Sequence, residues 1–234
     1  MPEHQVAEAE ADPDLSTERA EPAWRERAVT RSLDAARSRA EERVQRFLDA
    51  AFELIDERGS TEFTIQDVVE RSKQSLRAFY EYFEGKDELV LALFEETLDE
   101  ASADIQAAVA AETDLMEKIH VFTIRLHEWC DPIEQPRKRG THHRRAISEF
   151  AMHLAANQAD RVRAALAPLS RLLFALIDDA VSAGLVNVES SRRAAALVQQ
   201  TVIYSWFGNR LVDDPKLRIS AEETWEFCLR GLGG

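Results

Sequence analysis

The stretch TIQDVVERSKQSLRAFYEYFEGKDEL, residues 64–89, decides the fold of this chain. It opens with Thr64, which stands before an apolar series and is followed three residues later by Asp67. A threonine N-cap with an acidic side chain three residues further on is close to a capping box, which marks the start of a helix. The pattern therefore predicts a short helix over residues 65–71.

A second short helix is predicted to follow after only three or four residues. Ser75 is its N-cap candidate, and Phe79 and Phe83 are spaced to lie on its inner face over residues 76–82. Gly85 separates this helix from the next one. Two short helices joined by so tight a turn are typical of the helix-turn-helix unit, whose second helix fits the major groove of DNA.

The outer face of the second helix carries side chains that suit contact with a duplex. Arg77 can donate two parallel hydrogen bonds to guanine O6 and N7. Hydroxyl and ammonium groups around the motif can hold phosphates, and Thr64 and Lys86 stand at predicted helix N-termini, which attract anions. The candidate DNA contacts in and beside the motif are Arg37, Arg39, Arg43, Thr64, Ser75, Leu76, Arg77, Ala78, Tyr80, Tyr82 and Lys86.

Charge changes sign along the N-terminal part of the chain. Residues 1–22 have seven acidic residues against one arginine and few large apolar residues, which predicts a disordered tail. Residues 23–46 have seven arginines against four acidic residues, within a chain whose net charge is −14. Such a charge argues against coating nucleic acid over the whole surface, but screening over about 8 Å permits one local basic patch.

Two alternatives stay open for these N-terminal segments. Nearness to the motif favours phosphate contacts for the three arginines from residue 37 onward, whereas the arginines over 25–31 fit a solvated helix face equally well. The acidic tail either competes with DNA for the basic patch or only aids solubility.

Every periodic segment outside the motif also predicts helix. An apolar stripe from Val44 to Ile55 predicts a long helix over residues 39–58 that stops at Gly59. With 8 glycines and 7 prolines, turns are few and no strand is convincing, so the fold is predicted to be all-α. Pro168 is expected to kink or split its helix. The expected later helices run from Gly85 to about Val109, over about 115–130 and 141–156, from about Val162 to Gly184, and over about 190–212 and 221–231.

The quoted stretch resembles the DNA-binding signature of TetR-type (tetracycline-repressor-like) transcriptional regulators. It shares a Thr-capped helix, a tight turn, a Ser-capped recognition helix with aromatic residues and then Lys-(Glu/Asp)-x-Leu, and the match covers about Arg43 to Leu93. The family usually has Ala-Gly-Val in the turn, where this chain has Ser72-Lys73-Gln74. If the turn needs φ > 0, a lysine there costs roughly 1–2 kcal/mol.

The resemblance implies an N-terminal three-helix helix-turn-helix domain followed by a helical domain for ligand binding and dimerisation. The corresponding boundaries are an acidic tail at 1–22, a DNA-binding domain with a basic extension at 23–84 and the second domain at 85–234. The implied function is a sequence-specific DNA-binding transcriptional regulator in the cytoplasm, a repressor that a small-molecule effector releases from double-stranded operator DNA.

The resemblance also implies a homodimer with one reading head in each subunit. The heads must lie about 34 Å apart to enter successive major grooves, and an effector that favours another spacing weakens DNA binding. In the family the last two long helices form the dimer, here those over about 190–212 and 221–231. The residues expected in this interface are Leu197, Val198, Val202, Trp206, Trp225, Cys228 and Leu229.

The sequence gives its least specific evidence about the effector site. Phe122, Leu126 and Trp129, with Phe150 from the next helix, either line an effector cavity or belong to a simple core. The basic run over residues 137–145 either holds an anionic effector, such as the phosphates of an acyl-CoA, or is a solvated loop. The expected effector is therefore an unidentified small molecule that is hydrophobic or acyl-CoA-like.

Other classes of protein find little support in the sequence. No run approaches the ~18 apolar residues of a membrane span, and the acidic N-terminus does not resemble a secretory signal. The chain has two cysteines, and His120 and His127 have no close third ligand, so neither a metal nor a cofactor is expected. An enzyme is disfavoured because no nucleophile, phosphate-loop or zinc-protease motif is present. A helical interaction protein that has lost DNA binding stays the alternative, supported by the unusual turn at Lys73.

Overall fold

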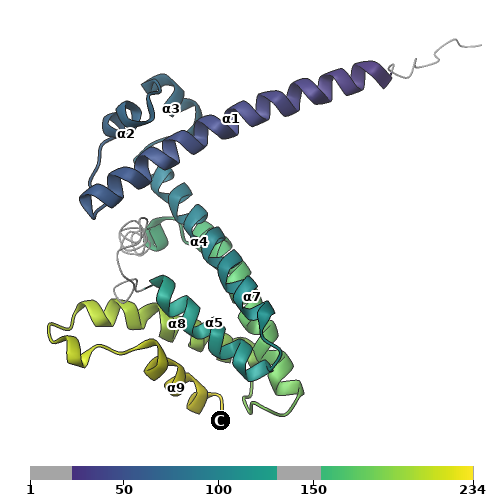
Figure 1. Ribbon diagram of the computed structural model, residues 1–234, viewed down its shortest axis with the longest axis vertical. Coiled ribbons are helices and arrows are strands. Elements are labelled where there is room, and N and C mark those ends of the chain that lie inside the picture. The colour runs from purple at the N-terminus through teal and green to yellow at the C-terminus, as the bar shows by residue number, and fades with distance from the viewer. Residues whose placement is uncertain (1–22, 131–153, 234) are drawn as a thin grey trace, which may run out of the picture. The chain divides into compact units, whose positions relative to one another are not determined.

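The computed structural model describes residues 23–130 and 154–233, and this part of the chain contains helices and no strand. The all-α prediction is confirmed. The helices are shown in Figure 1. Their bounds are α1 (Ala23–Arg58), α2 (Ile65–Ser72), α3 (Leu76–Tyr82), α4 (Lys86–Ala111), α5 (Leu115–Cys130), α7 (Ala159–Ser182), α8 (Ser191–Arg210), the short 3-10 helix η2 (Pro215–Leu217) and α9 (Ala221–Gly231).

The chain forms two compact units, residues 1–43 and residues 44–234. The described part of the first unit is the N-terminal portion of α1, whose side chains are almost all exposed. The predicted acidic tail at 1–22, the basic run over 137–145 and most of the helix expected over 141–156 lie outside the described residues, although residues 154–157 are helical. The predicted domain boundary after residue 84 falls within the second unit and stays a prediction.

The second unit has two apolar cores. The first core joins the end of α1 to α2, α3 and the start of α4, and Phe47 lies at its centre with Phe79 at 5.5 Å and Phe83 at 6.1 Å between ring centroids. Leu154 and Val162 also pack into it, so residues far along the chain complete the core under the helix-turn-helix unit. Edge-to-face aromatic pairs of this kind add to the stability that burial provides.

The second core lies among the C-terminal part of α4 and helices α5, α7, α8 and α9. His120 links α5 to α9 because its Nδ1 lies 3.1 Å from Glu117 Oε1 and its Nε2 lies 3.1 Å from Glu222 Oε2. Partial burial alone would lower the pKa of His120, but hydrogen bonds and charges from the two glutamates together outweigh it and raise the pKa. The imidazolium form is thus favoured at this helix contact.

Helix α7 contains the proline that was expected to kink or split it. The helix runs through Pro168 without a break, so it is not split there. Leu169 and Leu173 follow directly and are fully buried in the second core, so their packing offsets the hydrogen bond that proline removes. Helix α9 begins with a capping box, in which Ser220 and Glu223 each accept from the other's backbone N–H.

Among the described residues, no helix combines the length and apolar character that crossing a bilayer requires.

Candidate nucleic-acid interface

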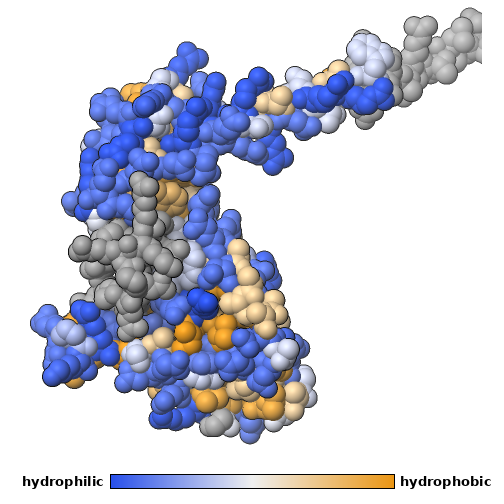
Figure 2. All heavy atoms as spheres, viewed as in Figure 1, coloured by the Kyte–Doolittle hydropathy of each residue, from blue (hydrophilic) through white to orange (hydrophobic). Residues whose placement is uncertain are grey.

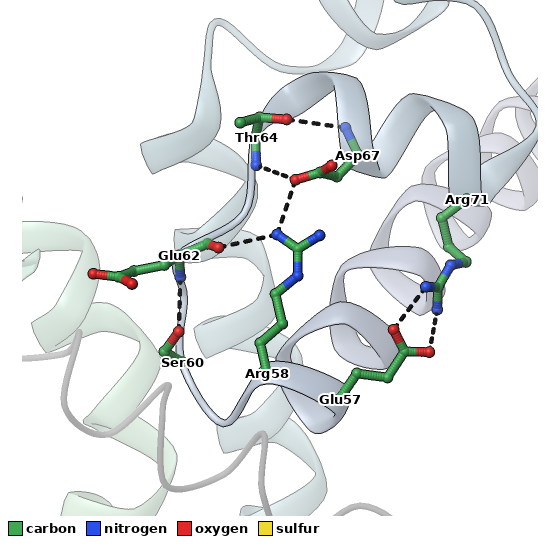
Figure 3. A network of polar contacts seen from close by, with 7 residues as sticks. All are labelled: Glu57, Arg58, Ser60, Glu62, Thr64, Asp67 and Arg71. Carbon is green, nitrogen blue, oxygen red and sulfur yellow. Dashed lines mark hydrogen bonds and ion pairs between the residues drawn. The ribbon is translucent and has the colours of Figure 1, made fainter.

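The start of α2 is fixed by a complete capping box. Thr64 Oγ1 accepts from the backbone N–H of Asp67 at 3.1 Å, and Asp67 Oδ2 accepts from the backbone N–H of Thr64 at 2.8 Å. Arg58 Nη1, from the end of α1, donates to Asp67 Oδ2 at 2.9 Å and to the carbonyl of Glu62 at 3.0 Å (Figure 3). The Arg58 guanidinium and then the Thr64 backbone hold the pKa of Asp67 well below its usual range, at about 2. The negative charge at this helix N-terminus is therefore already supplied by the protein.

A second arginine ties the other end of α2 to α1. Arg71 Nη1 and Nη2 donate to the two oxygens of Glu57, each at 2.7 Å, and Nη1 also lies 3.2 Å from Glu53 Oε2 (Figure 3 shows the Glu57 pair). A bidentate pair fixes orientation as well as distance. The sequence interpretation missed both arginine contacts. For the Arg71 contacts, the one signal in the sequence was the i, i+4 spacing of Glu53 and Glu57.

The turn between α2 and α3 contains a left-handed residue. Lys73 has φ 55° and ψ 36°, and among the described residues it is the only one other than glycine with a positive φ. Its backbone N–H donates to the carbonyl of Glu70 at 3.3 Å, and the next N–H donates to Val69 at 3.2 Å. The turn thus has a positive φ at this position, which meets the condition under which lysine carries a cost, and it closes with lysine in the place where glycine is usual.

The recognition helix α3 presents one face to the core and the other to solvent. Ser75 caps it by accepting from the backbone N–H of Ala78 at 3.1 Å. Phe79 is fully buried, whereas Tyr80 is 56% exposed and the Arg77 side chain is 91% exposed. In Figure 2 the surface over α2 and α3 is mostly hydrophilic. The inner and outer faces therefore lie as the spacing predicted.

The other predicted contacts on this helix differ in their accessibility. Leu76 is exposed beside Arg77 and Tyr80, but Ala78 and Tyr82 are half-buried and pack against the first core. Their side chains are therefore less available to a duplex than the sequence interpretation expected.

Lys86, a predicted phosphate contact, packs against the ring of Phe63. Lys86 opens α4, and its ammonium lies 4.9 Å from the centroid of the Phe63 ring. Because Phe63 directly precedes Thr64, the cation from α4 lies beside the start of α2. Arg37, Arg39 and Arg43 belong to the other compact unit and are exposed, with Arg37 Nε donating to Glu41 Oε1 at 2.7 Å.

The residues predicted to line an effector cavity have different positions. Phe122 and Leu126 are buried within the second core, as the simpler of the two interpretations expected. Trp129 is half-buried, and its indole N–H donates to Asp104 Oδ2 at 3.1 Å. Phe150 lies outside the described residues. A hollow of about 530 Å³ occurs elsewhere, on α8 and α9, with Arg193, Leu197 and Phe227 in its lining.

The expected dimer contacts stay a prediction, and the structure gives the burial of their residues. Val198, Val202, Trp206, Trp225 and Cys228 are buried within their own chain. Both faces of α8 and α9 carry apolar residues, and periodicity alone does not tell which face turns inward. Only Leu197 is exposed and Leu229 half-buried. The exposed apolar side chains of these helices and of the residue after α8 are Leu197, Tyr204, Phe207, Leu211 and Phe227, and Figure 2 shows apolar patches in this region.

Comparison with known proteins identifies the same segment. Residues 47–93 match the family model described as "Bacterial regulatory proteins, tetR family". The HTH-type transcriptional regulator BetI of Brucella anthropi is 32% identical over 77 residues, which are 33% of this chain. The match spans 40% of that relative, so the chain covers well under half the length of the curated relatives it matches.

Solved structures extend the likeness in fold to most of the chain. A TetR-family transcriptional regulator from Pectobacterium atrosepticum has a TM-score of 0.65 at 20% identity and covers 84% of this chain and 96% of its own. The regulator FadR from Bacillus subtilis, solved in complex with stearoyl-CoA, has a TM-score of 0.58 at 14% identity and covers 80% of this chain and 98% of its own. At such identities the likeness concerns the fold.

Proposed function

We propose that this chain is a regulatory protein of the tetR type, whose family model matches residues 47–93, and that it acts as a sequence-specific transcriptional regulator, a repressor that a small-molecule effector releases from its operator. The observation that carries this proposal is the outer face of α3, where Arg77 and Tyr80 are exposed while Phe79 anchors the helix in the core. A short helix held in this way can enter the major groove with its side chains toward the bases.

Within this proposal the side chains of the helix-turn-helix unit have separate roles. Arg77 reads a base edge, and Leu76 and Tyr80 make further contacts in the groove. Ser75 and Lys86 hold phosphates and fix the register, whereas Thr64, predicted to do the same, stands at a helix N-terminus that already carries the Asp67 carboxylate. The alternative of a helical protein without DNA binding had rested on the turn at residue 73, and the closed turn described above leaves it without that support.

Selection of DNA from a random-sequence pool, followed by gel-shift titration, tests the proposal. Arg77→Ala should cost about 1–3 kcal/mol of binding free energy at one base position, while Lys86→Ala should weaken all sequences alike and reduce the salt slope by about 1. Lys216→Ala is the matched control because this exposed lysine lies in η2, outside the helix-turn-helix unit. Failure of the wild type to enrich any sequence would refute the proposal.

We propose that the protein acts as a homodimer through the outer face of α8 and α9. Leu197 and Phe227 are large apolar side chains that stand exposed around the 530 Å³ hollow on this face. Burial of such side chains against a second copy is favourable at about 25 cal/mol per Å². A two-fold dimer would present two copies of α3 to one duplex, as half-sites one helical turn apart require.

The effector is proposed to be an apolar or acyl-CoA-like molecule. Support comes from the FadR relative solved with stearoyl-CoA and from the basic run over residues 137–145. Stearoyl-CoA added to the operator complex should release DNA, with unacylated CoA as the control. Unchanged operator affinity at saturating stearoyl-CoA would contradict this class of effector. No enzymatic reaction is part of the proposal.

A further inference from the structure

The outer face of α3 places an acidic side chain beside its cation. Arg77 and Glu81 are the two charged residues of this helix, one turn apart, and Arg77 Nε lies 3.5 Å from Glu81 Oε1. The two side chains are 91% and 49% exposed. Exposed i, i+4 pairs shift a folding equilibrium by only about twofold. The pair therefore contributes little to the formation of α3.

A carboxylate on this face also disfavours DNA in general. Phosphate contacts dominate the affinity of proteins for duplexes of any sequence, and a negative charge near the backbone opposes them. Glu81 thus weakens binding to all sequences alike unless it improves recognition of one of them. Loss of non-specific affinity combined with retained specific affinity is an increase in specificity.

The geometry of the pair indicates how specificity would be gained. Glu81 Oε1 lies nearest the Nε of the Arg77 guanidinium, at 3.5 Å, and a contact at Nε leaves the two terminal Nη groups able to donate as a pair. Guanine offers the matching acceptors, O6 and N7, in the major groove. The carboxylate also attracts the guanidinium away from neighbouring phosphates, where an arginine this exposed would otherwise lie.

We propose that Glu81 is a specificity-determining residue that positions Arg77 toward guanine, so that each half-site contains a G·C base pair that this arginine–glutamate pair selects. This inference rests on the proposed function and assigns a role to a side chain that does not itself need to touch DNA. Glu81 acts through Arg77 and is therefore a positioning residue.

The test compares Glu81→Gln with Glu84→Gln in the full-length protein. Glu84 is an exposed glutamate that follows α3, so the control removes the same charge three residues away. Both variants should bind unrelated DNA severalfold more tightly, because each removes one negative charge near the phosphates. Only Glu81→Gln should reduce discrimination at the G·C pair, by about fivefold or more, at the same position that Arg77→Ala relaxes.

A double variant separates positioning from a direct contact. In the Arg77→Ala background, Glu81→Gln should leave the remaining base preferences unchanged. Wild-type discrimination at every position in Glu81→Gln would overturn the inference, as would identical base-preference profiles for the two glutamine variants. A wild type that enriches no sequence would overturn the proposed function as well. If Arg77→Ala reduces discrimination at the G·C pair but Glu81→Gln does not, this inference alone would be overturned.

Discussion

Two adjacent aromatic residues of α3 allow a direct test of how the recognition helix is presented. Phe79 is fully buried, with ring centroids 5.5 Å from Phe47 and 5.3 Å from Phe83, whereas Tyr80 is 56% exposed. We compare Phe79→Ala with Tyr80→Ala because both remove an aromatic ring from the same helix at consecutive positions. Apart from the Tyr80 hydroxyl, the two side chains differ only in the direction in which they point from α3.

The expected loss of stability differs severalfold between the two variants. Truncating a buried phenylalanine costs about 3–5 kcal/mol, a large part of the ~5–15 kcal/mol that stabilises a domain. Tyr80 makes an edge-to-face contact with Phe79 at 5.5 Å, and its loss should cost about 0.5–1.5 kcal/mol. Phe79→Leu keeps most of the apolar volume and should cost roughly 1.5 kcal/mol or less.

Urea unfolding followed by circular dichroism measures these differences, and operator affinity is measured on the same samples. Phe79→Ala should lose stability and, with it, DNA binding. Tyr80→Ala should unfold at nearly the wild-type urea concentration and still bind operator more weakly. A Tyr80→Ala variant as unstable as Phe79→Ala would show that this face of α3 packs inward, and the proposed reading of DNA would then be wrong.

Three further predictions concern the turn, a titrating contact and the dimer face. Lys73→Gly should raise the free energy of unfolding by roughly 0.5–1 kcal/mol, because the left-handed strain that it relieves exceeds the extra conformational entropy that glycine loses on folding. A lower urea midpoint would contradict this prediction. The pKa of His120 is raised above 6.5, so its contact with Glu222 stabilises the fold at low pH and weakens as the pH rises through the folded pKa. The stability that His120→Gln loses relative to wild type should therefore shrink over that pH range, as measured by urea titrations. Leu197→Asp combined with Phe227→Asp should convert a dimer to a monomer in sedimentation velocity, and an unchanged dimer would place the interface elsewhere.

Local signals made the helix-turn-helix unit predictable from sequence. Thr64 and Ser75 are caps whose partners lie three residues away, and the core-facing side of α3 follows from the spacing of two phenylalanines. The comparison with the usual glycine also drew attention to Lys73 as the position where a positive φ would matter. Each of these features depends on residues within one or two turns of helix, which is the range over which sequence patterns act.

Features that depend on tertiary neighbours were not predictable in the same way. The pairing of Arg71 with Glu57 joins residues 14 apart on different helices, and the i, i+4 spacing of Glu53 and Glu57 does not by itself say which cation pairs with them. The apolar residues of α8 and α9 occur on both faces, so the sequence did not show that Val202 and Trp225, expected in the dimer interface, are buried within their own chain. The packed core around Leu169 likewise overrides the helix-breaking tendency of Pro168.

Helix α4 gives the two cores a common rigid element. Its first turns contribute Leu89 and Phe94 to the core beneath α3, and its later turns contribute Ile105 to the core of the C-terminal helices. Glu88 in its first turn accepts the backbone N–H of Glu84 at 2.6 Å, directly after the recognition helix ends. Coupling between two sites requires an element whose position both sites can bias. In the proposed regulator, a ligand that repacks the second core would act on the same helix that contacts the end of α3, and by linkage DNA binding would change the affinity for that ligand by the same factor.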